Sequence, residues 1–187
     1  MRAVRQALPD AAVASRSQCI IDAIARHEAW ASAREIALFW PMLARKEVDL
    51  RALDALGRQQ GKRLWYPSQW EQGERSFTGF RLSERAEELI ERGHRFAEPP
   101  ASAPLAQPGQ LGLVVVPALA AAPDGQRLGY GAGWYDATLG EFCPPAVAMV
   151  VTFDFQLVVE LPSLPHDLAV QWVVTDRRVL RAGSAAL

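Results

Sequence analysis

A short glycine-rich stretch, residues 125–136, carries the residue types that a bound polyphosphate would need. Its sequence is Gly-Gln-Arg-Leu-Gly-Tyr-Gly-Ala-Gly-Trp-Tyr-Asp. Three glycines stand at alternate positions, Gly129, Gly131 and Gly133. Because glycine has no Cβ atom, the backbone N–H groups of such a stretch can approach a bulky anion closely. The spacing therefore predicts a loop that holds phosphate groups.

Two charged residues in the same stretch strengthen this hypothesis. Arg127 places a permanent positive charge beside the glycines. Asp136 adds a carboxylate that can bridge to phosphate through a magnesium ion. The stretch follows an apolar run at residues 111–116 and leads into a segment, 135–139, that we expect to start a helix, whose dipole favours anions. Together these features fit a polyphosphate and its metal ion.

The alternative is that the glycines only make a tight connection between a strand and a helix. The stretch is not a dinucleotide-binding fingerprint, because Trp134 stands where the third glycine of G-x-G-x-x-G belongs. It is not a P-loop either, because no Gly-Lys-Ser/Thr follows.

The composition is that of an ordinary globular protein. The chain has 187 residues, 50% hydrophobic and 22% charged, which favours one domain over residues 1–187. Lys and Arg number 20 against 21 Asp and Glu, so no basic excess predicts nucleic-acid binding. The two cysteines form no metal motif, the first residues have no apolar core of signal-peptide type, and no apolar run is long enough to span a membrane. We expect a cytoplasmic monomer or weak dimer that acts on small molecules, with no membrane partner.

Apolar periodicity predicts strands that alternate with helices. Helices are expected over residues 11–30, 48–60, 85–92 and 135–139. Strands are expected over residues 35–40, 62–66, 76–81, 111–116, 146–153 and 171–175, with a polar loop at 69–74 and an irregular connector at 96–109. This order predicts an α/β fold of three layers, α/β/α, with a largely parallel central sheet. Ligands of such sheets bind beyond the carboxyl ends of strands, where the glycine-rich stretch falls.

The chain resembles the 5-formyltetrahydrofolate cyclo-ligase family, also called methenyltetrahydrofolate synthetases. The resemblance rests on a strand that ends in Val116-Pro117, followed at residues 125–136 by a match to the family pattern Gly-x-Arg-Leu-Gly-x-Gly-x-Gly-Tyr/Phe-Tyr-Asp, with Trp134 at the Tyr/Phe position. Further matches lie along the chain in the family's order, namely Gly61-Lys62-Arg63, Pro67, Glu98-Pro99, Gln156, Leu161-Pro162, His166-Asp167 and Val173-Val174-Thr175.

The resemblance implies a reaction. Members of this family use ATP and Mg²⁺ to close 5-formyltetrahydrofolate into 5,10-methenyltetrahydrofolate, with release of ADP and phosphate. A formamide oxygen is a poor leaving group, so it is first phosphorylated. A protein would contribute mainly by positioning the γ-phosphate and neutralising its developing charge.

The resemblance also implies residue roles in the glycine-rich stretch. Arg127 and Tyr135 would be catalytic. ATP would be bound by Arg127, Leu128, Gly129, Tyr130, Gly131, Ala132, Gly133, Trp134 and Tyr135. Asp136 and Asp167 would be magnesium ligands. The alternative for Asp167 is a cap on a turn or helix after Pro165.

On the folate side, the resemblance implies contacts from Glu47, Met42 and Trp40. The alternative for Glu47 is a carboxylate that opens the helix expected at 48–60. The alternative for Trp40 and Met42 is ordinary core packing.

The chain departs from the family pattern at four alanines. Ala121-Ala122 replaces a usual Phe-Asp, and Ala137 replaces an arginine. Ala132, between Gly131 and Gly133, stands where the family usually has a further glycine. Arg2 and Arg5 are candidates for the family's N-terminal basic pair, although the register of the match is open. Two other functions therefore stay open, a non-catalytic protein that binds nucleotide or folate as a regulator or interaction module, and a different phosphate-binding enzyme on a similar scaffold.

Overall fold

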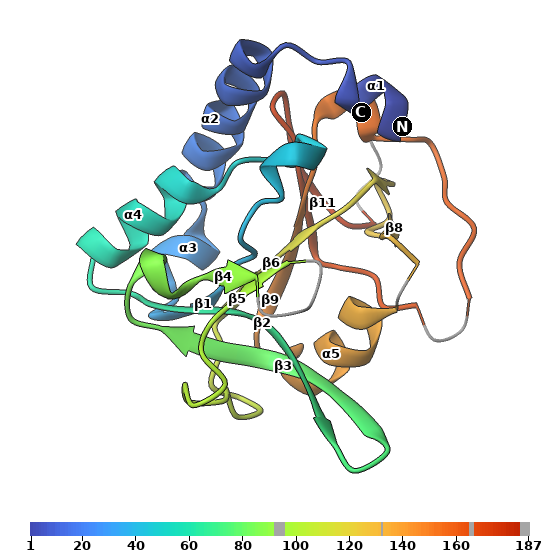
Figure 1. Cartoon of the computed structure of the whole chain (residues 1–187). Helices are drawn as coiled ribbons and strands as arrows, with labels where there is room; N and C mark the ends of the chain where they lie inside the picture. The colour runs from blue at the N-terminus through green and yellow to red at the C-terminus, as the bar shows by residue number, and fades with distance from the viewer. Residues whose placement is uncertain (92–95, 132, 165–166, 184–187) are drawn as a thin grey trace.

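A mixed β-sheet forms the centre of the molecule. The computed structural model describes residues 1–91, 96–131, 133–164 and 167–183. Within these residues the sheet has seven strands (Figure 1), in the spatial order β11 (Val179–Arg181), β10 (Trp172–Val174), β9 (Val147–Val151), β6 (Leu113–Pro117), β1 (Glu35–Ala37), β2 (Arg63–Gln72) and β3 (Arg75–Ser83). Strands from β10 to β2 are parallel to their neighbours, and only the outer strands β11 and β3 are antiparallel.

Helices cover both faces of this sheet. On one face lie α2 (Asp10–Arg26), α3 (Glu28–Ser32) and α4 (Arg51–Gln59), and on the other lies α5 (Trp134–Phe142). Successive residues of β6 serve the two layers in turn, as the period of two in a strand requires. Val115 packs in the core beneath α2 and α4, whereas Val114 and Val116 pack in the core beneath α5. The expected three-layer α/β/α fold is therefore confirmed.

The shorter elements sit around this core. They are α1 (Arg2–Gln6), the 3₁₀ turns η1 (Leu43–Arg45), η2 (Ala86–Glu88) and η3 (Asp154–Gln156), and the antiparallel pairs β4 (Ile90–Glu91) with β5 (Ala97–Glu98) and β7 (Ala120–Ala121) with β8 (Arg127–Leu128). The β7–β8 pair opens the glycine-rich stretch as a small hairpin, because it sets Ala121 opposite Arg127.

The strand order fixes where a ligand can bind. After β1 the chain returns through α4 to β2 on one side, and after β6 it returns through α5 to β9 on the other side. The connections therefore diverge between β1 and β6, which are neighbours in the sheet. In open α/β sheets the crevice beyond the carboxyl ends of two such strands is the usual ligand site.

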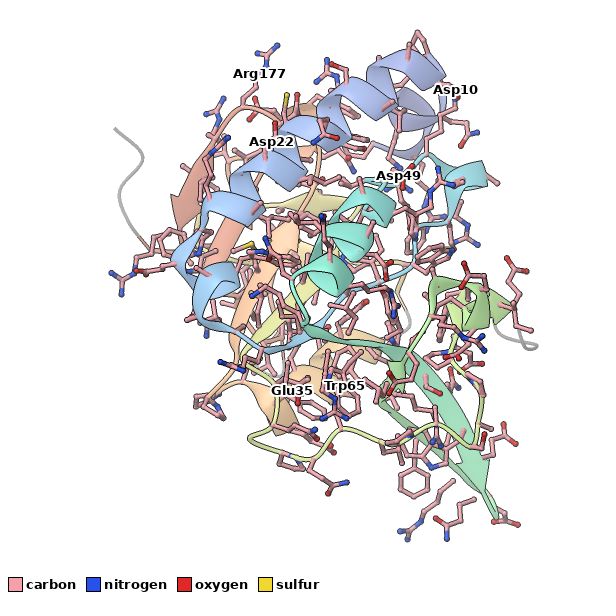
Figure 2. The ribbon with its side chains drawn as sticks, turned by 90° about the vertical axis from the view of Figure 1, so that its left-hand side faces the viewer. Asp10, Asp22, Glu35, Asp49, Trp65 and Arg177 are labelled. Carbon is pink, nitrogen blue, oxygen red and sulfur yellow. The ribbon has the colours of Figure 1, made fainter. Side chains whose placement is uncertain are left out.

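Polar contacts join β1 and β2 at the amino end of β1, opposite the crevice. Figure 2 shows Glu35, the first residue of β1, beside Trp65 of β2. The indole N–H of Trp65 donates to Oε2 of Glu35 at 2.6 Å, and Nη1 of Arg63 lies 2.8 Å from Oε1. These contacts tie β1 to β2 at the end of the strands that lies away from the crevice.

Some sequence predictions were wrong in detail. The polar loop expected at 69–74 is the end of β2, which runs to Gln72 and pairs with β3 in a long hairpin (Figure 1). Trp70 and Phe77 pair across this hairpin with ring centroids 5.9 Å apart. Pro67 does not end the strand, because it lies beyond Trp65, the last residue of β2 that pairs with β1.

Two predicted helices are also shorter than expected. Residues 11–30 form two helices, because His27 has an extended conformation and its Nδ1 accepts the Ala29 N–H that begins α3, at 3.1 Å. Residues 85–92 contain only the turn η2 before β4 begins. The other predicted helices and strands are present near their expected positions.

Candidate active site

A cleft of about 1590 Å³ opens at the carboxyl ends of β1 and β6. Small-molecule sites usually measure about 300–1000 Å³, so this cleft has room for two ligands together. Segments far apart in the sequence line it, among them α1, the segment after β1, the glycine-rich stretch, and residues 162–164 with Asp167. The structure brings together in this cleft every site residue that the sequence predicted, except Ala132, which lies outside the described residues.

Within the described part of the glycine-rich stretch, Gly125 is the glycine whose replacement the surrounding structure would not tolerate. Gly125 has φ +89°, and a Cβ atom there would lie 2.2 Å from the carbonyl oxygen of Val170. Gly131 and Gly133 also have positive φ, but their missing side chains would meet nothing within 4 Å. Gly129 has neither a positive φ nor a neighbour within 4 Å. Its lack of a side chain therefore serves no packing need, which favours close approach by a ligand.

The start of α5 adds to an anion-binding surface. The helix begins immediately after Gly133, and no side chain caps it. Gly133, Trp134, Tyr135 and Asp136 all line the cleft. The first N–H groups of a helix have no partner within the helix, and the helix dipole makes that end positive. This end of α5 can therefore receive a phosphate group.

Arg127 and Asp136 form an ion pair on this surface. Nη2 of Arg127 lies 2.7 Å from Oδ1 of Asp136, and the Arg127 side chain is only 5% exposed. Arg127 also donates to the carbonyl oxygen of Leu168, and the N–H of Leu168 donates to Asp136 Oδ1 at 3.3 Å. These bonds hold the glycine-rich stretch against the chain near residue 168.

Two aspartates of the cleft, Asp136 and Asp167, are too few to hold a metal ion unless phosphate and water supply its other ligands. Asp136 and Asp167 both line the cleft. Across the described residues, no three His, Cys, Asp or Glu side chains gather into a metal site. Magnesium commonly takes one or two carboxylates and fills its remaining positions with phosphate and water, so two carboxylates fit a metal that arrives with a polyphosphate. Oδ2 of Asp167 also accepts the Leu164 N–H at 2.7 Å.

Glu47 is a buried carboxylate on the opposite wall. Its residue is 2% exposed, Oε2 accepts the Met42 N–H at 2.9 Å, and Oε1 accepts the Tyr130 hydroxyl at 2.8 Å. Burial raises the pKa of Glu47, while these two hydrogen bonds and the charges of Arg5 and Arg45 oppose the rise. Glu47 does not open α4, because the residue before that helix is Leu50 and no side chain caps it.

Trp40 and Met42 stand beside Glu47 with part of each side chain exposed to the cleft. The Trp40 ring meets the buried Tyr66 ring edge-on, with centroids 6.2 Å apart. Both residues are therefore placed as an apolar wall rather than as fully buried core.

Tyr135 is held as a neutral phenol. Burial raises its pKa, and the nearby charge of Glu47 adds to the rise while Arg127 opposes it. Its ring packs edge-on against Trp134, with centroids 4.7 Å apart. A phenol that stays protonated can donate a hydrogen bond into the cleft but does not supply a base.

Among the described residues, three arginines line the cleft besides Arg127. Sequence analysis left the roles of Arg2 and Arg5 open and missed Arg45. Arg2, Arg5 and Arg45 place their guanidinium groups 5.0, 5.9 and 4.9 Å from the centre of the Tyr130 ring. Arg5 is buried, donates to the Tyr130 hydroxyl, and its Nε has no partner among the described atoms. The spacing of Arg2 and Arg5 made them candidates from the sequence. Arg45 lies in η1, a short turn that no periodic pattern in the sequence predicted.

The alanines that depart from the family pattern have different surroundings. Ala121 and Ala122 are fully buried, so they complete the core rather than face the cleft. Asp124 does not replace the missing acid in the cleft, since it is exposed and its Oδ1 accepts the Gln126 N–H at 2.9 Å. Ala137 lines the cleft in the first turn of α5.

These observations define an α/β protein with a glycine-rich loop and a buried carboxylate facing each other across one large cleft. The chain belongs to the 5-formyltetrahydrofolate cyclo-ligase family, whose sequence profile matches residues 1–176. A 5-formyltetrahydrofolate cyclo-ligase of Mycolicibacterium smegmatis is 41% identical over 80 residues. That match spans 43% of this chain and 41% of the relative, less than half of either.

Solved structures share the fold. The structure of Aquifex aeolicus 5,10-methenyltetrahydrofolate synthetase matches 98% of this chain and 89% of its own, with a TM-score of 0.81 and 24% identity. That of a 5,10-methenyltetrahydrofolate synthetase from Mycoplasma pneumoniae matches 92% of each chain, with a TM-score of 0.71 and 20% identity.

Proposed function

We propose that the protein converts 5-formyltetrahydrofolate into 5,10-methenyltetrahydrofolate in a reaction that consumes ATP and requires Mg²⁺. The observation that carries this proposal is the large cleft in which the glycine-rich stretch faces Glu47. Membership of the cyclo-ligase family supports the same reaction. A cleft of this volume accommodates a nucleotide and a folate side by side.

The reaction needs the two substrates to meet in one geometry. The formyl oxygen attacks the γ-phosphorus of ATP, and the bond from that phosphorus to ADP breaks. The N10 nitrogen of the folate then attacks the activated formyl carbon, the carbon–oxygen bond breaks as phosphate leaves, and N10 loses its proton. Most of the catalytic gain in such a sequence comes from positioning and from stabilising phosphoryl charge.

In this proposal the glycine-rich stretch binds ATP. Backbone N–H groups around Gly129, Gly131 and Gly133, with the start of α5, hold the phosphates. Arg127 stabilises the charge that develops on the transferred phosphoryl group, and the neutral Tyr135 hydroxyl donates a hydrogen bond to it. Leu128, Tyr130 and Trp134 flank the nucleotide. Ala132, outside the described residues, stays in the proposal as part of the same loop.

The metal and folate contacts complete the assignment. Asp136 and Asp167 would hold Mg²⁺, which would neutralise phosphate charge when bound. Glu47 accepts hydrogen bonds from N–H groups of the pterin, and Trp40 and Met42 form the apolar wall against its ring. Because Glu47 is buried, a pterin donor is worth more to it than it would be in water.

A direct assay tests the proposal. Protein, 5-formyltetrahydrofolate, ATP and Mg²⁺ are mixed, and methenyltetrahydrofolate is followed by its near-ultraviolet absorbance. The expected result is a rise that disappears when ATP or Mg²⁺ is omitted. A flat trace from folded protein that still binds ATP or folate would instead favour a non-catalytic binding protein, the alternative that Ala137 in the cleft motivates.

We further propose that the protein acts as one domain over residues 1–187, as a cytoplasmic monomer or weak dimer, without nucleic-acid or membrane partners. The near-neutral net charge of −1 supports the first exclusion. In the described part of the chain, no helix has the length and apolar character that crossing a bilayer requires. Sedimentation at several concentrations measures the oligomeric state.

A further inference from the structure

Tyr130 is the side chain that crosses the cleft. It comes from the glycine-rich stretch, yet its hydroxyl donates to Oε1 of Glu47 at 2.8 Å. The same hydroxyl accepts a hydrogen bond from Nη2 of Arg5 in α1. One phenol therefore joins three segments that are far apart in the sequence.

The loop around Tyr130 has little other support. Side chains at Gly129, Gly131 and Gly133 would meet nothing within 4 Å, and Leu128 is 51% exposed. Where glycines pack against nothing, the position of the chain depends on the contacts of Tyr130, which are its two hydrogen bonds and the guanidinium groups against its ring. Any group that fixes the backbone of this loop also fixes the Tyr130 hydroxyl.

Glu47 is sensitive to the position of that hydroxyl. Among the described residues, Oε1 accepts a hydrogen bond from the Tyr130 hydroxyl and Oε2 accepts one from the Met42 N–H, and each oxygen can accept more. The 2-amino-4-oxo pterin ring presents adjacent N–H donors, which match the two oxygens of a carboxylate. Rotation of Glu47 away from this geometry would lose that match, and its burial makes a lost hydrogen bond costly.

We propose that Tyr130 is a positioning residue that couples the two substrate sites, because phosphates seated on the glycine-rich stretch fix Tyr130 and thereby orient Glu47 for the pterin. This inference rests on the proposed function. Coupling of binding free energies is reciprocal, so folate must strengthen nucleotide binding by the same factor. Loss of one hydrogen bond to a charged acceptor corresponds to a change in affinity of about tenfold.

The test compares the wild type with Tyr130→Phe by calorimetry. Phenylalanine keeps the aromatic face that Arg2 and Arg45 contact and removes only the hydroxyl. The affinity for 5-formyltetrahydrofolate is measured with and without a non-hydrolysable ATP analogue and Mg²⁺. Ser15→Ala, which removes an exposed hydroxyl from α2, is the matched control.

We expect the nucleotide analogue to tighten folate binding about tenfold in the wild type and in Ser15→Ala, and less than about twofold in Tyr130→Phe. The affinity of each variant for the nucleotide alone is measured as well, so that a direct loss of ATP binding is separated from a loss of coupling. Coupling that persists in Tyr130→Phe, or that is absent in the wild type although both ligands bind, would overturn the inference alone. Failure of the wild type to bind either ligand would overturn the proposed function together with it.

A pH profile adds a readout that a purely structural role would not change. The Tyr130 hydroxyl, the Met42 N–H, Arg5 and Arg45 all favour the charged form of Glu47, against its burial. Loss of the hydroxyl raises the pKa of Glu47 further. Folate binding by Tyr130→Phe should therefore begin to fall at a higher pH than in the wild type as the solution is acidified, and an unchanged profile would contradict the proposed role.

Discussion

Arg127 and Asp136 are nine residues apart in the sequence and lie 2.7 Å apart across the start of α5. A metal polyphosphate presents both charges that could replace this pair, with phosphate oxygens for the arginine and a cation for the carboxylate. The pair therefore keeps two opposite charges in the cleft at modest electrostatic cost. Removing either partner leaves the other without its counter-charge. The expected effects differ, because Asp136 is the proposed metal ligand and Arg127 the proposed phosphate contact.

Asp136→Asn should raise the magnesium requirement of the proposed reaction. The amide keeps the size of the side chain but loses the charge that attracts the metal, so the magnesium concentration for half-maximal rate should rise about tenfold. Steady-state rates against magnesium concentration measure this. Asp124→Asn is the matched control, because Asp124 lies nearby but is exposed and only closes a turn. An Asp136→Asn enzyme with wild-type rates at limiting magnesium would refute the metal assignment.

Arg127→Ala should weaken ATP binding by about tenfold or more and folate binding much less, because a charged hydrogen bond to phosphate is lost. Binding of each substrate alone, measured by calorimetry, separates the two effects. Arg75→Ala, on the exposed β2–β3 hairpin, controls for a simple change in net charge. If both affinities fell equally, Arg127 would have a folding role instead, through its bonds to Asp136 and Leu168.

Gly125→Ala and Gly129→Ala should have opposite profiles. The first forces a side chain into positive φ and against the Val170 carbonyl oxygen, so it should lower stability by about 2 kcal/mol or more. The second meets no atom within 4 Å, so its stability should change by less than about 0.5 kcal/mol while its ATP affinity falls. Thermal unfolding and nucleotide titration of both variants provide the comparison. A Gly129→Ala protein that binds ATP normally would argue against a close phosphate.

Glu47→Gln should stabilise the protein near neutral pH while weakening folate binding about tenfold. Burial raises the pKa of Glu47 in the native state, so the native state binds its proton more tightly than the unfolded chain does. Its contribution to stability is therefore greatest below the unfolded pKa, about 4.3, and is lost as pH rises through the native pKa. Removing the ionisable group removes this loss.

The matched comparison is Asp49→Asn, two residues away, where the sign is opposite. Burial raises the pKa of Asp49, but hydrogen bonds from Arg51 outweigh it, and the pKa is lowered overall. That group stabilises the protein above its unfolded pKa and ceases to do so as pH falls through the native pKa. Melting temperatures of both variants at neutral and acidic pH measure the difference. If Glu47→Gln melted below the wild type near neutral pH, the cost assigned to buried Glu47 would be wrong.

The parallel core could be predicted because its strands are short, continuously apolar and bounded by proline or glycine. Residues 111–116 and 146–153 are buried on both faces, and such runs have few alternatives. The β2–β3 hairpin could not be predicted in the same way. Gln69 to Glu74 reads as a polar loop, whereas cross-strand contacts such as the pairing of Trp70 with Phe77 extend the strands to Gln72 and Arg75.

The position of the candidate site followed from the glycine-rich stretch and the order of the strands. Its residue contacts did not, because they join segments that no local pattern connects. The hydrogen bond from Tyr130 to Glu47 spans 83 positions in the sequence, and that from Arg5 to Tyr130 spans 125. The catalytic, ATP-binding, folate-binding and metal-binding roles remain predictions until the variants above are measured.

The helix α1 has a practical consequence for anyone who assays this protein. Arg2 stacks on Tyr130 and lines the cleft, and Met1 immediately precedes it. An affinity tag fused before Met1 would therefore be attached close to the cleft, and a polyhistidine tag would bring metal-binding imidazoles near the cleft that contains the proposed magnesium ligands. Kinetic work should use protein from which an N-terminal tag has been cleaved.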